Sequence, residues 1–231
     1  MRTPHSVWID RAELAADPVA PTDHDPIVIG GRLAIRPLWA PPPAEGLIDV
    51  VLEHRRVFGS GEHPTTRACL EALCTLDPVG SLADLGCGAG LLAITAAKLG
   101  WAPVAAIDRQ DDAVQAVRAN ALRNGVLIDA WHADLATEPA PPADALAANV
   151  PLALHEAIAA RLDDPPTLLI ASGVLEDESE RMLSAYAGAG LREAGRRTVS
   201  GWAVLVLRSR PFSLRARAAR TPRRRPAPRP G

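Results

Sequence analysis

The sequence predicts an α/β fold in which helices cover both faces of a seven-stranded, mostly parallel sheet. From Leu82 onward, short apolar runs alternate with helical segments, a pattern typical of parallel sheets that are buried on both sides. Three glycines at alternate positions, Gly86, Gly88 and Gly90, separate the first apolar run from the first helix. Only Ser200-Gly201 separates the last two runs, so we expect the sheet to end in an antiparallel hairpin.

Each expected strand is a short apolar run bounded by polar or turn-forming residues. These runs span residues 81–85, 104–107, 128–132, 145–150, 167–172, 192–200 and 202–208. The helices between them are expected at 91–99, 111–123, 152–162 and 177–189. A further helix is expected before the sheet, opened by Pro64-Thr65-Thr66 and running through Leu76.

We expect three regions along the chain. Residues 1–56 form a short N-terminal extension with a small β-hairpin, since Gly30-Gly31 separates two runs of β-branched residues; a further short strand is expected at 47–52. Residues 57–209 form the α/β domain. Residues 210–231 form a disordered tail rich in arginine and proline, because this segment lacks the apolar residues that a core needs.

The net charge of −2 conceals an uneven distribution of charge. From Arg208 to the end there are nine arginines and no acidic residue, whereas the preceding residues include 16 basic and 27 acidic side chains. An acidic body attracts basic partners and argues against a body that grips nucleic-acid phosphates. The arginine-rich tail is either a solvated segment or a weak RNA-binding arm. Lys98 is the only lysine in the chain.

The sequence indicates neither a metal site nor a membrane segment. The cysteines Cys69, Cys74 and Cys87 are odd in number and lack the spacing of metal ligands, so we expect buried thiols in a reducing compartment. The N-terminal residues show no apolar signal segment, and the most apolar stretch is interrupted by a lysine, a glycine and a proline. We therefore expect a cytoplasmic protein.

The glycine stretch indicates a ligand that lies over the start of a helix. A dinucleotide fingerprint places its third glycine three positions after the second, but Gly90 follows Gly88 by two. Asp84 lies two residues before Gly86, and an acid at that place suits a ligand with a cationic amine. A plain tight turn is the alternative interpretation.

Four polar or turn residues follow successive strands of the predicted sheet: Gly86, Asp108, Asp134 and Asn149. In open α/β sheets, ligands bind at the carboxyl ends of the strands. We therefore expect these four residues to meet at one edge, although they are far apart in the sequence.

Two separate motifs resemble one known family. Asp84-Leu85-Gly86-Cys87-Gly88-Ala89-Gly90 is similar to the first motif of class I S-adenosylmethionine (SAM) methyltransferases, which have a Rossmann-like fold. Phe58-Gly59-Ser60-Gly61-Glu62-His63-Pro64-Thr65-Thr66-Arg67 resembles the loop before that motif in PrmA-type methyltransferases, which trimethylate the eleventh protein of the large ribosomal subunit. Similar segments follow in the family's order at residues 120–125, 148–150 and 172–176.

The resemblance implies SAM as cofactor. The family's contacts fall on Thr66, Gly86, Asp108 and Asn149. With the residues that the glycine motif and the strand ends add, the expected cofactor-binding set is Thr66, Asp84, Gly86, Gly88, Gly90, Asp108, Asp134 and Asn149. In this set, Asp108 would accept from both ribose hydroxyls, the glycine backbone would pass the methionine part, and Asp134 would accept from the adenine amino group.

The function that this resemblance implies is SAM-dependent N-methylation of a protein amine, a lysine or an α-amino group, with a basic and ribosomal type of substrate. Asn149 is the expected catalytic residue, because its carbonyl oxygen can orient a neutral amine without adding charge. His63 or Glu62 could pass the released proton outward. For His63 a structural position in the loop is the alternative, and for Thr66 it is a helix cap.

The chain departs from the family in two places. Only roughly 50 residues precede the loop, so we expect a reduced N-terminal substrate-recognition region. Asn149 is followed by Val150-Pro151, which is closer to the Asn-Pro-Pro motif of glutamine and nucleic-acid amino methyltransferases. A small-molecule or nucleic-acid amino methyltransferase therefore stays open as an alternative, as does a protein that binds SAM without turnover.

Overall fold

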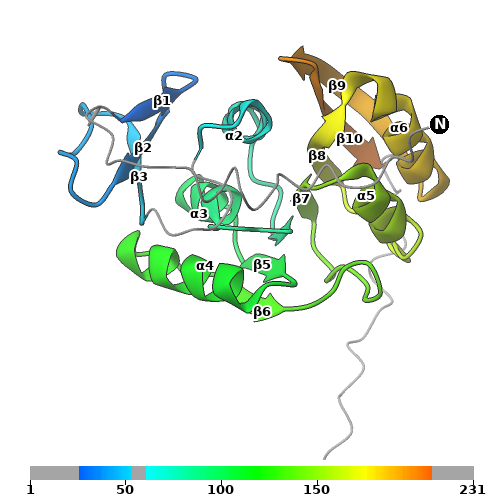
Figure 1. Ribbon diagram of the computed structural model, residues 1–231, viewed down its shortest axis with the longest axis horizontal. Helices are drawn as coiled ribbons and strands as arrows, with labels where there is room; N and C mark the ends of the chain where they lie inside the picture. The colour runs from blue at the N-terminus through cyan, green and yellow to red at the C-terminus, as the bar shows by residue number, and fades with distance from the viewer. Residues whose placement is uncertain (1–25, 54–60, 210–231) are drawn as a thin grey trace, which may run out of the picture.

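The computed structural model describes residues 26–53 and 61–209, which form a large sheet with its helices and a smaller sheet (Figure 1). The strands of the large sheet are β4 (Leu82–Leu85), β5 (Val104–Asp108), β6 (Asp129–His132), β7 (Ala145–Asn149), β8 (Leu168–Leu175), β9 (Leu191–Val199) and β10 (Trp202–Ser209). The helices are α2 (Pro64–Thr75), α3 (Leu91–Lys98), α4 (Asp111–Arg123), α5 (Leu152–Ala159), the short 3₁₀ helix η1 (Glu176–Glu178) and α6 (Ser179–Gly188).

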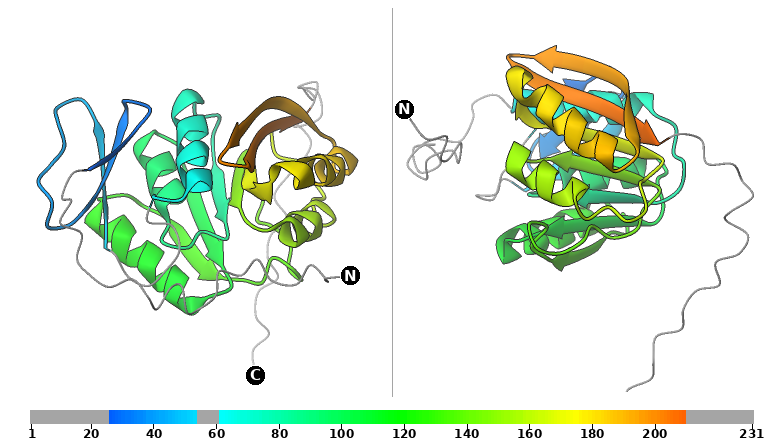
Figure 2. Two further views of the ribbon diagram at one scale, coloured as in Figure 1. Left: turned by 45° about the horizontal axis from the view of Figure 1, so that its top comes forward. Right: turned by 90° about the vertical axis from the view of Figure 1, so that its right-hand side faces the viewer.

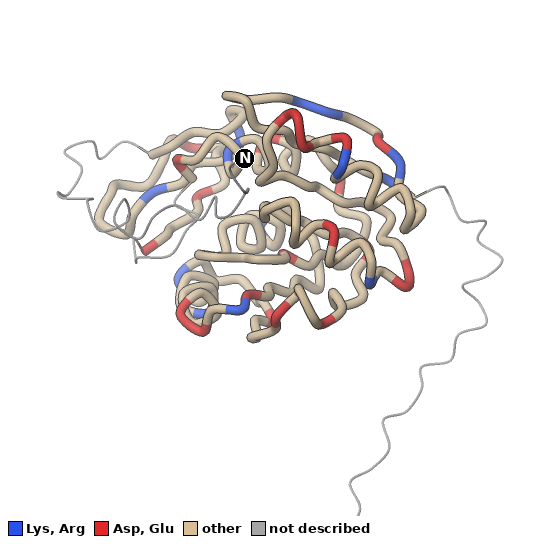
Figure 3. Tube along the Cα trace, turned by 45° about the vertical axis from the view of Figure 1, so that its right-hand side comes forward, with Lys and Arg blue, Asp and Glu red and all other residues tan. Residues whose placement is uncertain are grey.

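The order of the large sheet is β6-β5-β4-β7-β8-β10-β9, with five parallel strands followed by the antiparallel strands β10 and β9. This arrangement confirms the predicted seven-stranded sheet and its final hairpin. The edge strand β9 exposes three arginines, and basic residues gather along this edge of the molecule (Figure 3). Charged side chains on an edge strand oppose pairing with another chain. Among the described residues, no helix has the length and apolar content to cross a membrane.

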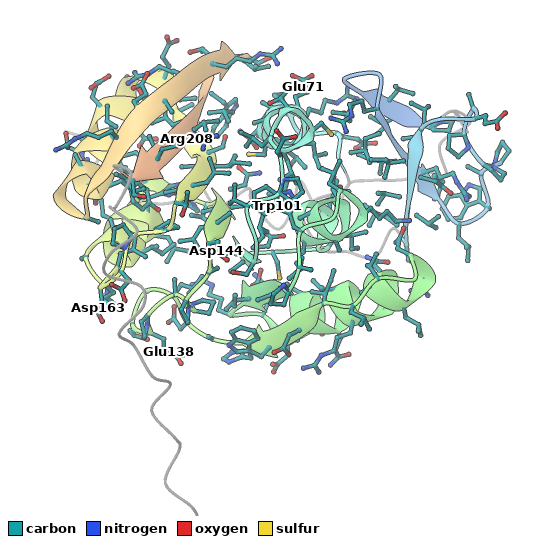
Figure 4. The ribbon with its side chains drawn as sticks, turned by 180° about the vertical axis from the view of Figure 1, so that it is seen from behind. Glu71, Trp101, Glu138, Asp144, Asp163 and Arg208 are labelled. Atoms are coloured by element: carbon teal, nitrogen blue, oxygen red, sulfur yellow. The ribbon has the colours of Figure 1, made fainter. Side chains whose placement is uncertain are left out.

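Alternate residues of each strand face two different helical layers. Leu82 and Ala147 pack with α2, α3 and α4, whereas Ala83 and Leu146 pack with α5 and α6. This alternation follows from the two-residue period of a strand. Trp101 is buried in the first layer, and Figure 4 shows its side chain inside the molecule beside α3. Both faces of the central strands are therefore apolar, as the continuous apolar runs of the sequence predicted.

The smaller sheet consists of β1 (Ile27–Ile29), β2 (Leu33–Pro37) and β3 (Ile48–Leu52). β1 and β2 pair as the hairpin expected at Gly30-Gly31. β3 lies parallel to β2, a pairing that the sequence did not predict because the residues that join them bear no helical or strand pattern.

The smaller sheet lies beside α3 and α4 (Figure 2). Its buried side chains Ile29, Leu33, Ile35, Val50 and Leu52 belong to the same hydrophobic cluster as those of α2 and α3. The smaller sheet and these helices therefore share one core, and the predicted boundary at residue 56, which lies outside the described residues, stays a prediction. The predicted tail at 210–231 lies outside the described residues.

β8 is longer than expected and contains a bulge. The strand continues past Ser172 to Leu175, and its pairing with β10 skips Gly173. Gly173 has φ +90°, and a Cβ atom there would lie 2.6 Å from the Val150 carbonyl oxygen and 2.7 Å from the Val150 nitrogen. Glycine permits this close approach of two backbones. Helix α6 begins later than expected, because Glu176–Glu178 form a 3₁₀ turn in which the Glu178 carboxylate accepts from Leu175 N at 3.0 Å.

We expect Gly173→Ala to reduce the free energy of unfolding by about 3 kcal/mol or more, because it adds a backbone clash to the strain of a positive φ. Gly201→Ala is the matched control, since Gly201 has φ +79° and nothing within 4 Å of its Cβ position. Its loss should be about 1 kcal/mol, from backbone strain alone. Urea unfolding followed by tryptophan fluorescence measures both losses. Equal losses would show that the approach to Val150 is unimportant.

Candidate functional site

The tight turn between β4 and α3 is built by three glycines in the left-handed region. Gly86, Gly88 and Gly90 have φ of +73°, +52° and +81°. The amides of Gly86 and Cys87 donate to the Ile107 carbonyl at 2.8 and 3.0 Å, which fixes the turn to β5. Because other residues rarely adopt these dihedrals, the turn needs glycine here. The backbone therefore reverses at the end of β4, and α3 begins at once.

Three of the predicted polar residues project from one face of the sheet. Asp84 lies two residues after Leu82 on β4 and is buried on the side that α3 covers. Asp108 ends β5 and Asn149 ends β7, the two strands that flank β4. The two-residue period places both side chains on the same side as Asp84. Of the residues expected to meet at the strand ends, Asp108 and Asn149 thus lie on one face of the sheet.

A cavity at this edge is lined by both expected and unexpected residues. Those expected are Thr66, Asp84, Gly86, Gly88 and Asn149. Those that the sequence analysis missed are Cys87, Leu91 and Leu92. Their position in the sequence could have indicated them, because all three lie within or directly after the glycine stretch. The first residues of α3 must therefore face a ligand that is bound over that stretch.

Two carboxylates flank the turn. Asp108 accepts from Gly88 N through Oδ2 and from Gln110 N through Oδ1, both at 3.0 Å. Asp84 Oδ2 accepts from Ala93 N at 3.0 Å. Burial, and to a smaller extent the nearby charge of Asp108, raise the pKa of Asp84 to about 7, although the hydrogen bond from Ala93 N acts in the opposite direction. Because Asp84 lines the cavity, the cavity favours a cationic ligand, which would stabilise the ionised form of this carboxyl group.

Asn149 contacts α2, the helix that precedes the large sheet in the sequence. Its Nδ2 donates to Thr66 Oγ1 at 3.3 Å. This contact turns the amide nitrogen towards α2 and leaves the carbonyl oxygen Oδ1 as the acceptor that the sequence analysis expected. Thr66 is buried within α2 and is not its cap. The alternative interpretation of Thr66 as a helix cap is therefore wrong.

His63 is the N-cap of α2, so the structure supports its structural interpretation. Its Nδ1 lies 2.7 Å from Thr65 Oγ1 and accepts from Thr65 N at 3.3 Å. Its ring meets that of Trp202 edge to face, with the centroids 5.2 Å apart. Burial lowers the pKa of His63. Passage of a proton through His63 or Glu62 stays a prediction, as does every assigned contact with a cofactor.

Three expected cofactor residues, Gly90, Asp108 and Asp134, do not line the cavity. Asp108 reaches the turn through its hydrogen bond from Gly88 N. Gly90 lies behind the turn, where a Cβ atom would be 2.8 Å from Val117 Cγ2 of α4. Asp134 follows β6, and its Oδ1 accepts from Ala136 N at 3.0 Å within its own turn. Gly90 thus serves the close packing of α4, and the contact of Asp134 with adenine stays a prediction.

The thiols near the site are buried and protonated. Burial raises the pKa of Cys69 to about 12, and burial together with Asp84 and Asp108 raises the pKa of Cys87 well above its usual range. Cys74 is also a buried free thiol. Within residues 26–53 and 61–209, no three histidine, cysteine or acidic side chains gather closely enough to hold a metal ion.

A buried polar network lies behind Asn149. His155 of α5 contacts the Ser172 carbonyl through Nε2 at 2.8 Å and the Tyr186 hydroxyl through Nδ1 at 2.9 Å. Because a carbonyl only accepts, Nε2 carries the proton and the tyrosine hydroxyl donates to Nδ1. The same carbonyl accepts from Val150 N at 2.9 Å, which holds the chain directly after Asn149. Burial lowers the pKa of His155 to about 4, so the imidazole is neutral.

Comparison with known proteins identifies the family. The family model described as Ribosomal protein L11 methyltransferase (PrmA) matches residues 19–210. The chain belongs to this family. The resemblance inferred from the glycine motif and the preceding loop is thereby confirmed.

Several ribosomal protein L11 methyltransferases are similar to this member of the PrmA family. That of Dechloromonas aromatica is 42% identical over 168 residues, which are 71% of this chain and 56% of the relative. That of Escherichia coli is 40% identical over 168 residues, which are 70% of this chain and 57% of the relative. The chain thus spans less than three fifths of the length of these relatives.

Solved structures agree with the family. Ribosomal protein L11 methylase from Lactobacillus delbrueckii subsp. bulgaricus has a TM-score of 0.70 and 25% identity, with 80% of this chain and 98% of that chain covered. A Pyrococcus abyssi tRNA (uracil-54, C5)-methyltransferase in complex with S-adenosyl-L-homocysteine has a TM-score of 0.53 and 19% identity, with 62% and 38% covered. The second likeness shows the fold alone.

We expect the neutral state of His155 to make stability depend on pH. In the unfolded chain the imidazole binds a proton near pH 6.5, but in the folded chain only near pH 4. The contribution of neutral His155 to the free energy of unfolding is therefore fully present above about pH 6.5 and is lost as the pH decreases towards 4. Between pH 8 and pH 5 the loss should be about 2 kcal/mol larger in the wild type than in His155→Gln. Urea unfolding of both proteins at both pH values tests this prediction. An equal change in the free energy of unfolding in the wild type and in His155→Gln would contradict it.

Proposed function

We propose that this chain is a SAM-dependent N-methyltransferase whose acceptor is a protein amine, a lysine or an α-amino group of a ribosomal protein. The observation that supports it best is the position of Asn149. Its amide, oriented by Thr66, borders the same cavity as the glycine turn and Asp84. A donor-binding turn and an acceptor-orienting oxygen thus share one small space.

The chain's residues fit SAM as cofactor. Asp84 is a buried carboxyl group with a raised pKa. A neighbouring ammonium group would lower that pKa by stabilising the ionised carboxylate. Asp108 keeps lone pairs on both oxygens beyond those that accept from Gly88 and Gln110, so it can accept from a pair of ribose hydroxyls. The glycine turn offers backbone that a ligand can approach closely. When bound, SAM supplies an electrophilic methyl group on a sulfonium.

Asn149 would hold the acceptor in its reactive state. A lysine amine has a reference pKa of about 10.4, so it must lose a proton before it can attack. Burial beside the apolar side chains of Leu91 and Leu92 disfavours the charged amine and lowers its pKa. The carbonyl oxygen of Asn149 then accepts one N–H and directs the lone pair, without attracting the protonated form as a carboxylate would. Orientation of this kind contributes a large part of the rate of such transfers.

The substrate assignment rests on the relatives, which are named for ribosomal protein L11. The acidic residues that precede Arg208 would attract a basic ribosomal protein by long-range steering. A substrate of this kind would place the reaction in the cytoplasm. The relatives extend well beyond the part that matches this chain, which is 56% of the relative from Dechloromonas aromatica. Recognition of L11 by this chain is therefore part of the proposal.

One observation favours a second acceptor class. Asn149 is followed by Val150-Pro151, and Pro151 is the N-cap of α5. This sequence is closer to the motif of glutamine and nucleic-acid amino methyltransferases. An exocyclic base amine or a small-molecule amine is therefore the alternative acceptor, and the arginine-rich tail, outside the described residues, would suit RNA.

We expect the full chain to transfer label from methyl-labelled SAM to a protein in a ribosomal-protein fraction. Asn149→Ala should lower the rate constant of transfer about 100-fold, because the acceptor loses its orientation. Binding of S-adenosylhomocysteine, measured by calorimetry, should weaken much less than the rate constant falls, because the cofactor keeps its other contacts, and this difference separates lost catalysis from lost folding.

The fate of the label decides between the acceptor classes. Label that nuclease releases and protease leaves in place would replace the protein acceptor by RNA. Label found only in small molecules would replace it by a metabolite. Cofactor binding without transfer to any fraction would reduce the chain to a SAM-binding protein.

We also expect cofactor binding to release a proton from Asp84. Its raised pKa of about 7 leaves the free carboxyl largely protonated at pH 6, and the cofactor's ammonium favours the ionised form. Affinity for S-adenosylhomocysteine should rise between pH 6 and pH 8. Calorimetry at pH 6 in two buffers of different ionisation heat measures the released proton.

Asp84→Asn should abolish this proton release. Asp144→Asn is the control, because Asp144 accepts from Ser81 N at 3.0 Å at the amino-terminal edge of the sheet, away from the turn. Proton release that persists in Asp84→Asn would assign the raised pKa to another group.

A further inference from the structure

The segment at residues 120–125 resembles the family but has no assigned function, and it lies between the glycine turn and the smaller sheet. Asn120 of α4 is buried. Its Nδ2 donates to the Ala89 carbonyl at 3.0 Å, and its Oδ1 accepts from Glu53 N at 3.1 Å. Ala89 is the residue between Gly88 and Gly90, so one side chain connects the centre of the turn with the end of β3.

Asn124, the C-cap residue of α4 and four residues after Asn120, binds the same strand. Its Oδ1 accepts from Val51 N at 2.9 Å, and its Nδ2 donates to the Val51 carbonyl at 2.7 Å. An antiparallel neighbour strand would make the same pair of hydrogen bonds. β3 is an edge strand of its sheet, so Asn124 takes the place of a fourth strand at this residue.

α4 also packs directly on the turn. Val117, three residues before Asn120, lies 2.8 Å from the position that a Cβ of Gly90 would occupy. Residues three and four apart share one face of a helix. Val117, Asn120 and Asn124 thus form a single line that passes from the turn to β3.

We propose that Asn120 is a positioning residue, which holds the Cys87–Gly90 turn in its ligand-binding form and ties that turn to the N-terminal sheet. The inference rests on the proposed function in that the turn binds the cofactor. The amides of Gly86, Cys87 and Gly88 are held by Ile107 and Asp108, but these bonds do not engage the Ala89 carbonyl, which lies between two glycines. The amide of Asn120 holds this carbonyl, and the smaller sheet supports the amide through Glu53 N.

Apolar side chains of the smaller sheet and of α3 also meet around Gly61 and belong to one buried cluster. A Cβ at Gly61 would lie 2.9 Å from Ile35 of β2 and 3.3 Å from Leu91 of α3. Leu91 lines the cavity. The N-terminal sheet thus reaches the cofactor site by two routes and supports donor binding, in addition to any contact with substrate.

The test compares Asn120→Asp with Asn124→Asp in the full chain. Both changes are isosteric, lie on the same face of α4 and replace an amide donor by a carboxylate oxygen. Asn120 alone of the two contacts the turn. We expect Asn120→Asp to weaken calorimetric binding of S-adenosylhomocysteine about tenfold, because a buried carbonyl in the turn loses its donor. Asn124→Asp should change this affinity less than about twofold, although both should lower the melting temperature.

A second measurement needs no ligand. Gly90 N donates to the Cys87 carbonyl at 2.8 Å within the turn. In hydrogen–deuterium exchange, this amide should exchange faster in Asn120→Asp than in the wild type or Asn124→Asp.

Unchanged affinity and unchanged exchange in Asn120→Asp would overturn the inference. Equal weakening in both variants would also overturn it, since that result would show a general loosening of α4. A wild type that fails to bind S-adenosylhomocysteine, with exchange at Gly90 responding as expected, would remove the proposed function and leave the hold of Asn120 on the turn established.

Discussion

The reversal of the chain between β4 and α3 is the constraint on which the rest of the site depends. The glycines allow α3 to begin directly after the end of β4. The helix therefore covers Asp84, and the backbone amide of Ala93 in α3 donates to the Asp84 carboxylate. The same turn brings Gly88 N to Asp108 on the neighbouring strand. A longer connection would separate these groups and expose the carboxylate to water, where its pKa would return to the ordinary range.

The sequence predicted those parts of the site that depend on local rules. Strand ends were recognisable from apolar runs, so the sequence predicted that Asp108 and Asn149 meet at one edge of the sheet. That both lie on the same face as Asp84 follows from the observed register. Side-chain contacts across the fold could not be read in this way. The cap of α2 is His63 instead of Thr66, because the choice depends on which ring or hydroxyl the loop turns towards the helix.

Long-range pairings were the other part that local patterns could not supply. The parallel pairing of β2 with β3 has no turn signature, and its outer edge is completed by a helix side chain. The bulge at Gly173 likewise depends on the approach of Val150, the residue that follows β7. In both cases the decisive partner lies more than ten residues away, so neither propensity nor spacing marks it. The smaller sheet therefore became visible as part of the core only in three dimensions.

The scarcity of lysine has a consequence for self-modification. Lys98 is the only lysine of the chain, and it ends α3, whereas the glycine turn lies at the start of that helix. Eight helical residues at 1.5 Å each place about 12 Å between the two ends, along a rigid element. For a chain proposed to methylate amines, its own surface thus offers almost nothing that competes with the substrate. Arginine supplies positive charge in lysine's place and keeps its proton at any physiological pH.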